Sequence, residues 1–105
     1  MRMTVTTARV LAVLLTEPEA DRYGLDLMRA TGLSSGSLYP ILHRLQEAGW
    51  LSARWEEIDP AAEGRPARRF YRLTPDGVVQ ARQALAELRT QTTVPAATGK
   101  ASPAW

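Results

Sequence analysis

SSGSLYPILHRLQEAG, residues 34–49, is the stretch around which the rest of this chain is organised. Its apolar residues follow the i, i+3, i+4, i+7 spacing of one helical face: Leu38, Ile41, Leu42 and Leu45. The other side of the predicted helix carries small, aromatic and charged residues: Gly36, Tyr39, Pro40, His43, Arg44 and Glu47. A helix that only covers a core more often shows Lys and Glu pairs there, so this mixture indicates a contact surface. We interpret the stretch as a helix that enters the major groove of DNA.

The start of this helix depends on Pro40, because proline has no N–H to donate and is best tolerated in a first helical turn. With Ser37 as the N-cap residue, Pro40 would be the third helical residue and no intrahelical hydrogen bond would be lost. With Ser34 or Ser35 as the N-cap, one bond would be missing. In both arrangements free backbone N–H groups lie near residues 35–39, where they can bind a phosphate.

Two helices are predicted before this stretch. Thr6 or Thr7 can cap a first helix that runs to about Leu15 and is apolar around most of its circumference. Asp21 is the expected N-cap of a second helix over residues 22–31, which a glycine ends. A short turn then leads into the third helix. Two helices joined in this way, the second with a contact-like face, form a helix-turn-helix.

The hydrophobic period changes to two after Gly49. Residues 51–57 alternate between apolar and polar side chains and predict a strand, and residues 68–73 predict its return strand. Residues 59–66 contain the turn formers Asp, Pro and Gly, so we expect a loop there. A hairpin after a helix-turn-helix is the winged arrangement. The predicted fold class is therefore α+β: a winged helix-turn-helix with three helices and a β-hairpin wing.

A last helix is predicted with Thr74 as its N-cap and Pro75 as its first residue, and its apolar stripe runs along about residues 76–89. Its apolar stripe has little core left to cover, which favours a dimerisation helix. The residues predicted at the dimer interface come from this helix and the first one: Val10, Leu11, Leu14, Val78, Ala81, Leu85 and Leu88. The expected organisation is a DNA-binding domain over residues 1–74, a dimerisation helix over 75–90 and a disordered tail over 91–105.

Length and composition place limits on the class of protein. The 105 residues are enough for one domain, and 45% hydrophobic and 23% charged residues are ordinary for a globular protein. No apolar run approaches ~18 residues, so we expect no membrane span. The first residues lack a cleavage site for a signal peptide, and the chain has no cysteine, so we expect a cytoplasmic protein without disulfides.

Charge is more informative by its distribution than by the net value of +2. Residues 56–63 carry four acids and no base, whereas residues 65–72 carry four arginines and no acid. This basic segment lies on the return strand and its approach, and it indicates a local site for nucleic acid. Only one of the thirteen basic residues is Lys. The preference for Arg fits phosphate and guanine recognition, and codon bias of a GC-rich genome would produce it equally well.

Three segments resemble the PadR family of bacterial transcriptional regulators: YGLDLMRATG at residues 23–32, SLYPILHRLQEAGWL at residues 37–51 and GRPARRFYRLTPDG at residues 64–77. They occur in the order and spacing of that family and cover about residues 8–80. The resemblance implies a homodimeric winged helix that binds operator DNA, usually as a repressor. The short chain is similar to the small subtype, which dimerises through its first and last helices. Family effectors are diverse, so the resemblance names no ligand.

The predicted DNA contacts fall on the third helix and the wing: Ser34, Ser35, Ser37, Tyr39, Pro40, His43, Arg44, Arg65, Arg68 and Arg69. By resemblance, Tyr39 and its neighbours meet the major groove, and the wing arginines meet phosphate or the minor groove. Other roles stay open for some of them. Tyr39 can instead pack on the second helix, and part of the wing charge can neutralise Glu56 and Glu57 across the hairpin.

Several other functions are weighed against DNA binding. His43 is the single histidine and has no cysteine to help it, so we predict neither a metal site nor a cofactor. Ser37 and His43 are too far apart on a helix to act as nucleophile and base, so we do not expect an enzyme. Trp50 and Trp55 are expected to pack in the core or hairpin, or to form a wall for an aromatic effector at the dimer interface. The alternative function is a winged-helix module that binds proteins.

Overall fold

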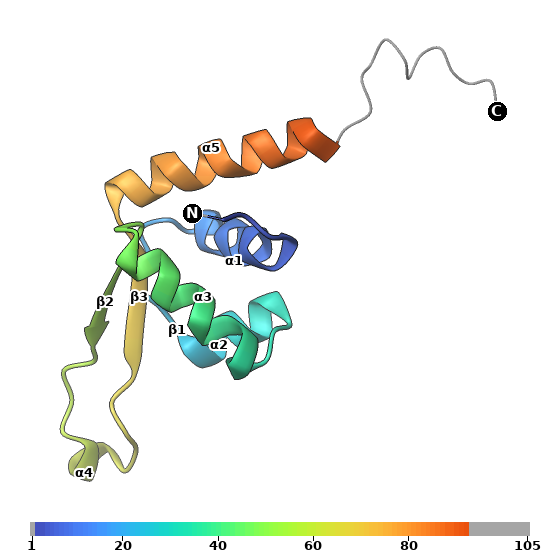
Figure 1. Ribbon diagram of the computed structural model, residues 1–105. Helices are drawn as coiled ribbons and strands as arrows, with labels where there is room; N and C mark the ends of the chain where they lie inside the picture. Colours follow the sequence, from blue (N-terminus) through green and yellow to red (C-terminus); the bar gives the residue numbers. More distant parts are fainter. Residues whose placement is uncertain (1, 93–105) are drawn as a thin grey trace, which may run out of the picture.

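The computed structural model describes residues 2–92 and forms a helical body with a hairpin projecting from it (Figure 1). The elements follow in this order: α1 (Val5–Thr16), β1 (Arg22–Tyr23), α2 (Gly24–Thr31), α3 (Ser35–Glu47), β2 (Leu51–Trp55), α4 (Pro60–Glu63), β3 (Arg69–Leu73) and α5 (Pro75–Thr92). The α+β winged helix predicted from the sequence is confirmed.

Helix α1 begins earlier than the sequence predicted. The expected caps were Thr6 or Thr7, but Thr4 is the N-cap residue and its hydroxyl accepts a hydrogen bond from the Thr7 N–H at 3.1 Å. Thr7 lies inside the helix and is buried. The Thr4 hydroxyl satisfies the Thr7 N–H, which has no acceptor inside the helix. The helix can therefore begin at Val5, directly after its cap.

The prediction that Asp21 caps the second helix was wrong. Residues 22 and 23 form a short strand, β1, in which Arg22 is paired with Tyr71 and Tyr23 with Phe70 of β3. Helix α2 therefore starts at Gly24, without a side-chain cap. Its end was predicted correctly, because Gly32 takes the left-handed conformation (φ 75°) and its N–H donates to the Met28 carbonyl.

The sheet has the order β1-β3-β2, and both pairings are antiparallel. Leu51 lies opposite Leu73, and both side chains are buried at the base of the hairpin. The tip differs from the predicted loop, because residues 60–63 form the helical turn α4. The Asp59 carboxylate accepts from the Ala61 N–H at 3.1 Å, and Gly64 ends the turn with φ 69°. A residue that caps and a glycine that stops the helix are enough for one turn.

The predicted cap of the last helix is confirmed, since the Thr74 hydroxyl accepts from the Gly77 N–H at 2.9 Å. The Thr74 N–H also donates to the Trp50 carbonyl at 2.9 Å, which ties the start of α5 to the turn between α3 and β2. Helix α5 then crosses above α1 and extends to Thr92, beyond the predicted end at Arg89 (Figure 1). Residues 93–105, most of the predicted tail, lie outside the described part of the chain.

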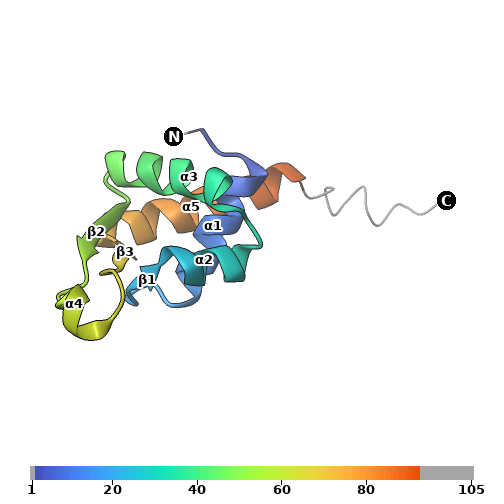
Figure 2. The ribbon, with the colours of Figure 1, turned by 90° about the horizontal axis from the view of Figure 1, so that it is seen from below.

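One hydrophobic core joins α1, α2, α3, the sheet and α5. The apolar stripe of the third helix faces this core as predicted: Leu38, Ile41, Leu42 and Leu45 are all buried. No helix within residues 2–92 combines the length and apolar character that crossing a bilayer requires. The N-terminal end of α3 and the hairpin tip both lie on the side opposite α5 (Figures 1 and 2). This places two predicted DNA-binding elements on one side of the molecule.

Candidate nucleic-acid interface

The outward face of α3 is exposed along its whole length. The predicted contact residues on it are all exposed to solvent: Ser35, Ser37, Tyr39, Pro40, His43 and Arg44. A helix diameter with side chains of about 10–12 Å matches the ~12 Å width of the DNA major groove. The helix is therefore held by one face and free to contact DNA with the other.

Ser34 is the N-cap residue of α3, so the structure has the second of the two starts considered from the sequence. Its carbonyl accepts from the Ser37 and Leu38 N–H groups at 3.1 and 2.9 Å. Its hydroxyl makes no capping bond and lies 3.4 Å from the Ser37 hydroxyl. The N–H groups at residues 35 and 36 have no acceptor inside the helix, and they lie at its positive end. This end of α3 can bind a phosphate.

Pro40 lies inside α3, in its second turn. Because its ring nitrogen has no hydrogen, it cannot donate to the Gly36 carbonyl four residues earlier. The Gly36 carbonyl therefore has a free acceptor position near the outer face of the helix. Pro40 itself is exposed and contributes a rigid apolar surface to that face.

Two basic side chains on α3 differ in their surroundings. His43 lies 3.3 Å from the Glu47 carboxylate, one turn later, and both side chains are about 70% exposed. Arg44 is exposed and forms no ion pair with any acid of residues 2–92. Arg44 is thus the more available of the two for a phosphate or a base edge.

Tyr39 packs on the second helix, one of the two roles that the sequence left open, and stays exposed enough for the other. Its ring packs over the first residue of α2, so closely that a Cβ on Gly24 would lie 1.9 Å from the Tyr39 hydroxyl oxygen. The side chain nevertheless remains 42% exposed. Contact with the second helix fixes the direction of the ring, and the exposed remainder is presented on the side of α3 that faces the hairpin.

The wing arginines predicted to contact DNA differ in their ion-pair partners. Arg65 makes a two-pronged ion pair with Glu56, with N–O distances of 2.7 and 3.1 Å. The Glu56 carboxylate also accepts from the Arg68 backbone N–H at 3.2 Å. The pKa of the Glu56 carboxyl is lower than usual, mainly because the Arg65 guanidinium donates hydrogen bonds to the carboxylate. The neutralisation of wing charge by Glu56 is confirmed, while Glu57 takes no part in an ion pair among the described residues.

A second ion-pair group at the base of the wing was missed from the sequence. Asp21 accepts from Arg54 of β2 at 2.7 Å and from Arg72 of β3 at 3.2 Å. Hydrogen bonds from Arg54 and then Arg72 lower the pKa of the Asp21 carboxyl. The strand register contained a signal for this group, since Arg54 is opposite Phe70 and Arg72 is opposite Ser52, which places the two arginines diagonally on one face.

Arg68 and Arg69 keep their charge without a carboxylate partner in residues 2–92, and each lies over an aromatic ring. The Arg68 guanidinium carbon is 4.6 Å from the centroid of Tyr23, and that of Arg69 is 5.1 Å from the centroid of Trp55. Cation–π contacts orient a guanidinium without cancelling its charge. Of the three wing residues predicted to contact DNA, these two are therefore the most available for phosphate.

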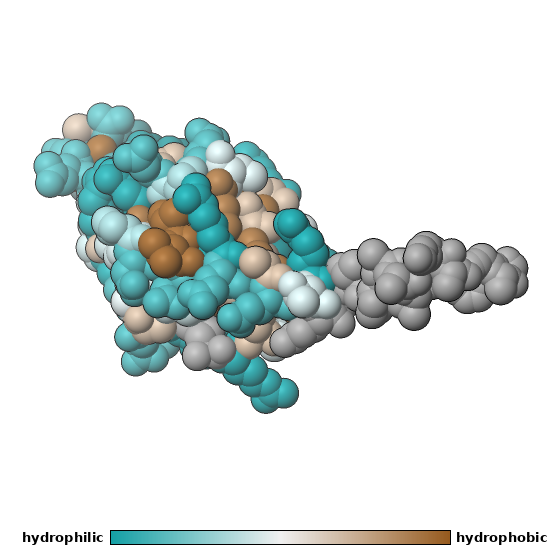
Figure 3. Space-filling model, turned by 90° about the horizontal axis from the view of Figure 1, so that it is seen from above, coloured by the Kyte–Doolittle hydropathy of each residue, from teal (hydrophilic) through white to brown (hydrophobic). Residues whose placement is uncertain are grey.

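The residues predicted at a dimer interface fall into two groups. Val10, Leu11, Leu14 and Ala81 lie in the core of the single chain, at most 2% exposed, where a partner cannot reach them. The apolar residues of α1 pack against α5 and the other helices of the same chain instead. Val78, Leu85 and Leu88 are half-buried along α5, and Val79 beside them is 61% exposed. The upper face of the molecule shows an apolar patch bordered by hydrophilic residues (Figure 3).

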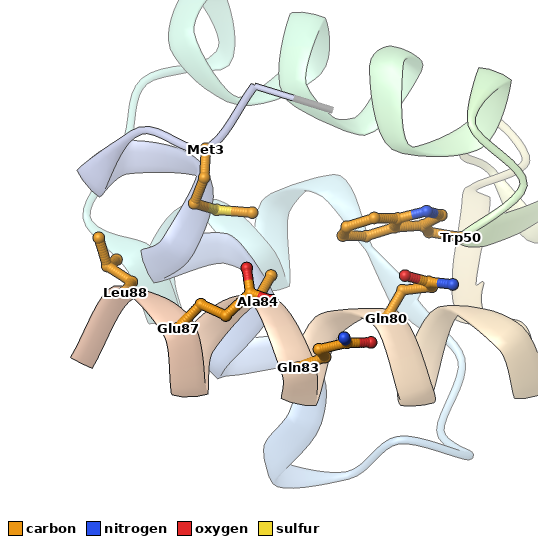
Figure 4. A pocket seen from close by; sticks show the side chains of 7 residues that line it. All are labelled: Met3, Trp50, Gln80, Gln83, Ala84, Glu87 and Leu88. Atoms are coloured by element: carbon orange, nitrogen blue, oxygen red, sulfur yellow. The ribbon is translucent and has the colours of Figure 1, made fainter. Parts of the chain in front are cut away.

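A cavity of about 280 Å³ lies between α5, the start of the chain and the turn after α3. Trp50 and Met3 face the side chains of α5 across it (Figure 4). Trp50 thus lines a cavity as well as packing on the core, whereas Trp55 is 61% exposed on the hairpin and is not a core residue. No cluster of three or more metal-ligating side chains occurs within residues 2–92.

The geometry defines the class first: a winged helix with an exposed third helix and a hairpin on the same side. Comparison with known sequences adds the family. The sequence profile of the transcriptional regulator PadR-like family matches residues 10–87, and the chain belongs to this family. This membership places the chain among transcriptional regulators, not enzymes, as the sequence predicted.

Individual relatives agree with this assignment. The transcriptional regulator Rv3488 of Mycobacterium tuberculosis (strain ATCC 25618 / H37Rv) is 46% identical over 59 residues, which are 53% of this chain and 50% of that protein. The chain thus spans about half the length of this curated relative. The structure of smu.1704 from Streptococcus mutans UA159 is similar with a TM-score of 0.66 and 27% identity, over 87% of this chain and 86% of that one. Reduced AbfR bound to DNA is similar with a TM-score of 0.66 and 25% identity, over 88% and 60% of the two chains.

Proposed function

We propose that this chain is a sequence-specific DNA-binding regulator that acts as a homodimeric repressor. The observation that carries the proposal is the outer face of α3, which is fully exposed on the same side as the hairpin. A major groove admits one α-helix, and the free N–H groups at the start of α3 suit a phosphate beside that groove. Membership of the PadR-like family supports the same function.

Within this proposal, positioning and reading are divided among different residues. The first turn of α3, Arg68 and Arg69 bind phosphates and fix the protein on the duplex. Tyr39 and Arg44 are the main candidates for reading base edges, since Arg donates two hydrogen bonds to guanine. His43 contributes less, because its Nε2 lies beside the Glu47 carboxylate, at 3.3 Å. Arg65 contributes only when it leaves Glu56.

The proposed dimer packs α5 of one copy against α5 of the other. The exposed Val79 and the half-buried Val78 and Leu85 offer an apolar surface for a second copy. In this dimer the two-fold axis lies in the α5 interface, and both α3 helices contact one DNA molecule because they lie on the same side along that axis. Half-sites about one turn apart, ~10 bp, then form a roughly palindromic operator. The cavity lined by Trp50 adjoins α5, so an effector bound there can alter the spacing of the two α3 helices.

The experiment that tests the proposal measures binding to the promoter region of the protein's own gene by fluorescence anisotropy at several salt concentrations. We expect Arg44→Ala to weaken binding by roughly tenfold and to relax discrimination against altered operator bases, and Arg68→Ala to flatten the salt dependence by about 0.9 for the lost phosphate contact. Arg82→Ala removes the same charge from the exposed surface of α5 and should leave DNA affinity unchanged. Absence of binding at low salt by a folded dimer would instead favour a protein-interaction module. A reporter under the same promoter distinguishes repression from activation.

A further inference from the structure

The second turn of α3 leaves one backbone carbonyl without its usual donor. In an α-helix the carbonyl oxygen of residue 36 would accept from the N–H of residue 40. Residue 40 is proline and has no N–H, so the Gly36 oxygen keeps its capacity to accept a hydrogen bond. Both residues are exposed to solvent. The oxygen is therefore open to a donor from outside the chain.

This oxygen lies on the face of α3 that the proposed function assigns to DNA. At about 100° per residue, Gly36 and Pro40 lie opposite Leu38, whose side chain is fully buried. Carbonyls on the solvent side of a helix tilt outward, and the Pro40 ring favours this tilt because it fills the space of the missing N–H. Residue 36 has no side chain to obstruct the approach, so the edge of a base can come close to the oxygen.

Stability does not explain the choice of these two residues. Glycine and proline are the two poorest helix formers, and Pro40 lies beyond the first turn, where proline is best tolerated. Packing does not require them, because Pro40 is exposed and a Cβ at residue 36 would meet only the Ser34 hydroxyl oxygen within 4 Å, at 3.9 Å. Two departures from helix preference on one exposed face indicate a functional requirement.

The chemistry of the major groove restricts what the Gly36 oxygen can bind. A carbonyl oxygen accepts hydrogen bonds and donates none. The donors on base edges in this groove are the amino groups of cytosine (N4) and adenine (N6). Guanine and thymine present only acceptors and a methyl group there. An exposed carbonyl on α3 therefore distinguishes cytosine and adenine from the other two bases.

We propose that the Gly36 carbonyl oxygen accepts a hydrogen bond from the exocyclic amino group of a cytosine or adenine, and that Pro40 keeps this oxygen available by withholding an N–H. The carbonyl complements Arg44, which can only donate and so suits guanine. Gly36 is then a specificity-determining residue that acts through its backbone. The inference rests on the proposed function, because it requires α3 to lie in the major groove.

The test begins with an operator selected by the wild-type protein from random duplex DNA. Each cytosine is then replaced by 2-pyrimidinone and each adenine by purine, because these analogues lack the amino group and keep the ring. We expect one replacement in each half-site to weaken wild-type binding by roughly three- to tenfold, measured by fluorescence anisotropy. Cytosine and adenine are distinguished by which analogue has this effect.

Pro40→Ala restores the N–H and closes the bond to the Gly36 carbonyl. In this variant the same replacement should change DNA affinity less than twofold, and the difference from wild type gives the coupling between residue 40 and the amino group. The variant should also resist urea better than the wild type, which separates lost discrimination from unfolding. Gln46→Ala changes an exposed α3 residue without altering the backbone bonds, so it should respond to the replacement as the wild type does.

The inference is overturned if no amino group matters, or if Pro40→Ala loses the same factor as the wild type. It is also overturned if the effect of Pro40→Ala follows the replacement of thymine by uracil, since the proline ring would then act on a thymine methyl group. A folded protein that selects no sequence would contradict the proposed function itself. That outcome is distinct, because it appears in the selection step, before any analogue is used.

Discussion

The hydroxyl oxygen of Tyr39 lies against the backbone of Gly24, so that a Cβ on residue 24 would be 1.9 Å from it. The second helix begins with a glycine at the place where the third helix needs room for an aromatic ring. This contact sets the direction in which Tyr39 leaves α3, and it links the packing of the helix-turn-helix to the proposed DNA-binding face.

Gly24→Ala should displace Tyr39 and weaken DNA binding several-fold. The clash is with the far end of a side chain that is 42% exposed, so the ring can turn outward and stability should change by less than about 1 kcal/mol. Anisotropy with promoter DNA and urea unfolding measure the two quantities. In a Tyr39→Ala background, Gly24→Ala should have no further effect on DNA affinity. An equal loss in both backgrounds would show that the glycine acts through another group.

Gly77→Ala should destabilise the fold by about 1–3 kcal/mol, because the added Cβ would lie 2.0 Å from the Trp50 carbonyl oxygen. That oxygen belongs to the backbone and accepts from the Thr74 N–H, so it cannot move without disturbing the start of α5. Urea unfolding measures the change. Gly36→Ala is the matched control, since its nearest neighbour would be a flexible hydroxyl at 3.9 Å. There the exchange should stabilise α3 by about 0.5–1 kcal/mol.

Asp21→Asn should lower stability by up to about 1 kcal/mol at neutral pH, because the two arginines on it are half-exposed. The folded-state pKa of Asp21 is depressed, so its contribution is fully present above the unfolded value of about 3.9 and is lost as pH falls through the lower folded value. The difference in unfolding free energy between wild type and variant should therefore be constant at pH 5–7 and shrink below pH 4. A difference that persists at the lowest pH would exclude the carboxylate as its source.

Glu56→Gln should increase DNA affinity and steepen its salt dependence. The change removes the charge that holds Arg65, and each arginine freed to contact a phosphate adds about 0.9 to the slope of log K against log salt. The matched control is Glu57→Gln, which removes the same charge from the neighbouring residue without breaking an ion pair among residues 2–92. It should raise affinity less and leave the slope nearer to that of the wild type. Identical slopes for the two variants would show that Arg65 stays off the DNA.

Val79→Asp should shift the proposed dimer toward monomers, because it places a charge in the apolar surface of α5. Sedimentation velocity at several protein concentrations measures the shift. Leu25→Asp changes an exposed apolar residue of α2, a helix that lies on the other side of α1 from α5 (Figure 1), and should leave the association unchanged. A wild-type protein that is monomeric at all concentrations would remove α5 from the proposed interface.

Most helices and strands could be predicted from the sequence, because their apolar spacing and their caps involve residues close together in the chain. The apolar spacing of α3, the alternation of β2 and β3 and the Thr74 cap each depend on residues within one or two turns. Three predictions failed for the opposite reason. Asp21 resembles an N-cap, but it pairs with arginines that are 33 and 51 residues away in the sequence. Residues 22 and 23 form a strand because they pair with β3. The first helix is apolar around most of its circumference because α5 of the same chain packs against it.

The sequence by itself determined which face of α3 is exposed. The apolar stripe from Leu38 to Leu45 must face the core, and its burial leaves Tyr39, Pro40, His43 and Arg44 in solvent. Only the tertiary structure decided which arginines remain available. Arg54, Arg65 and Arg72 are drawn to Asp21 and Glu56, while Arg68 and Arg69 keep their charge over aromatic rings. The physical reason is range: burial of a helical face follows from a period of a few residues, whereas an ion pair follows from distances that exist only after the chain has folded.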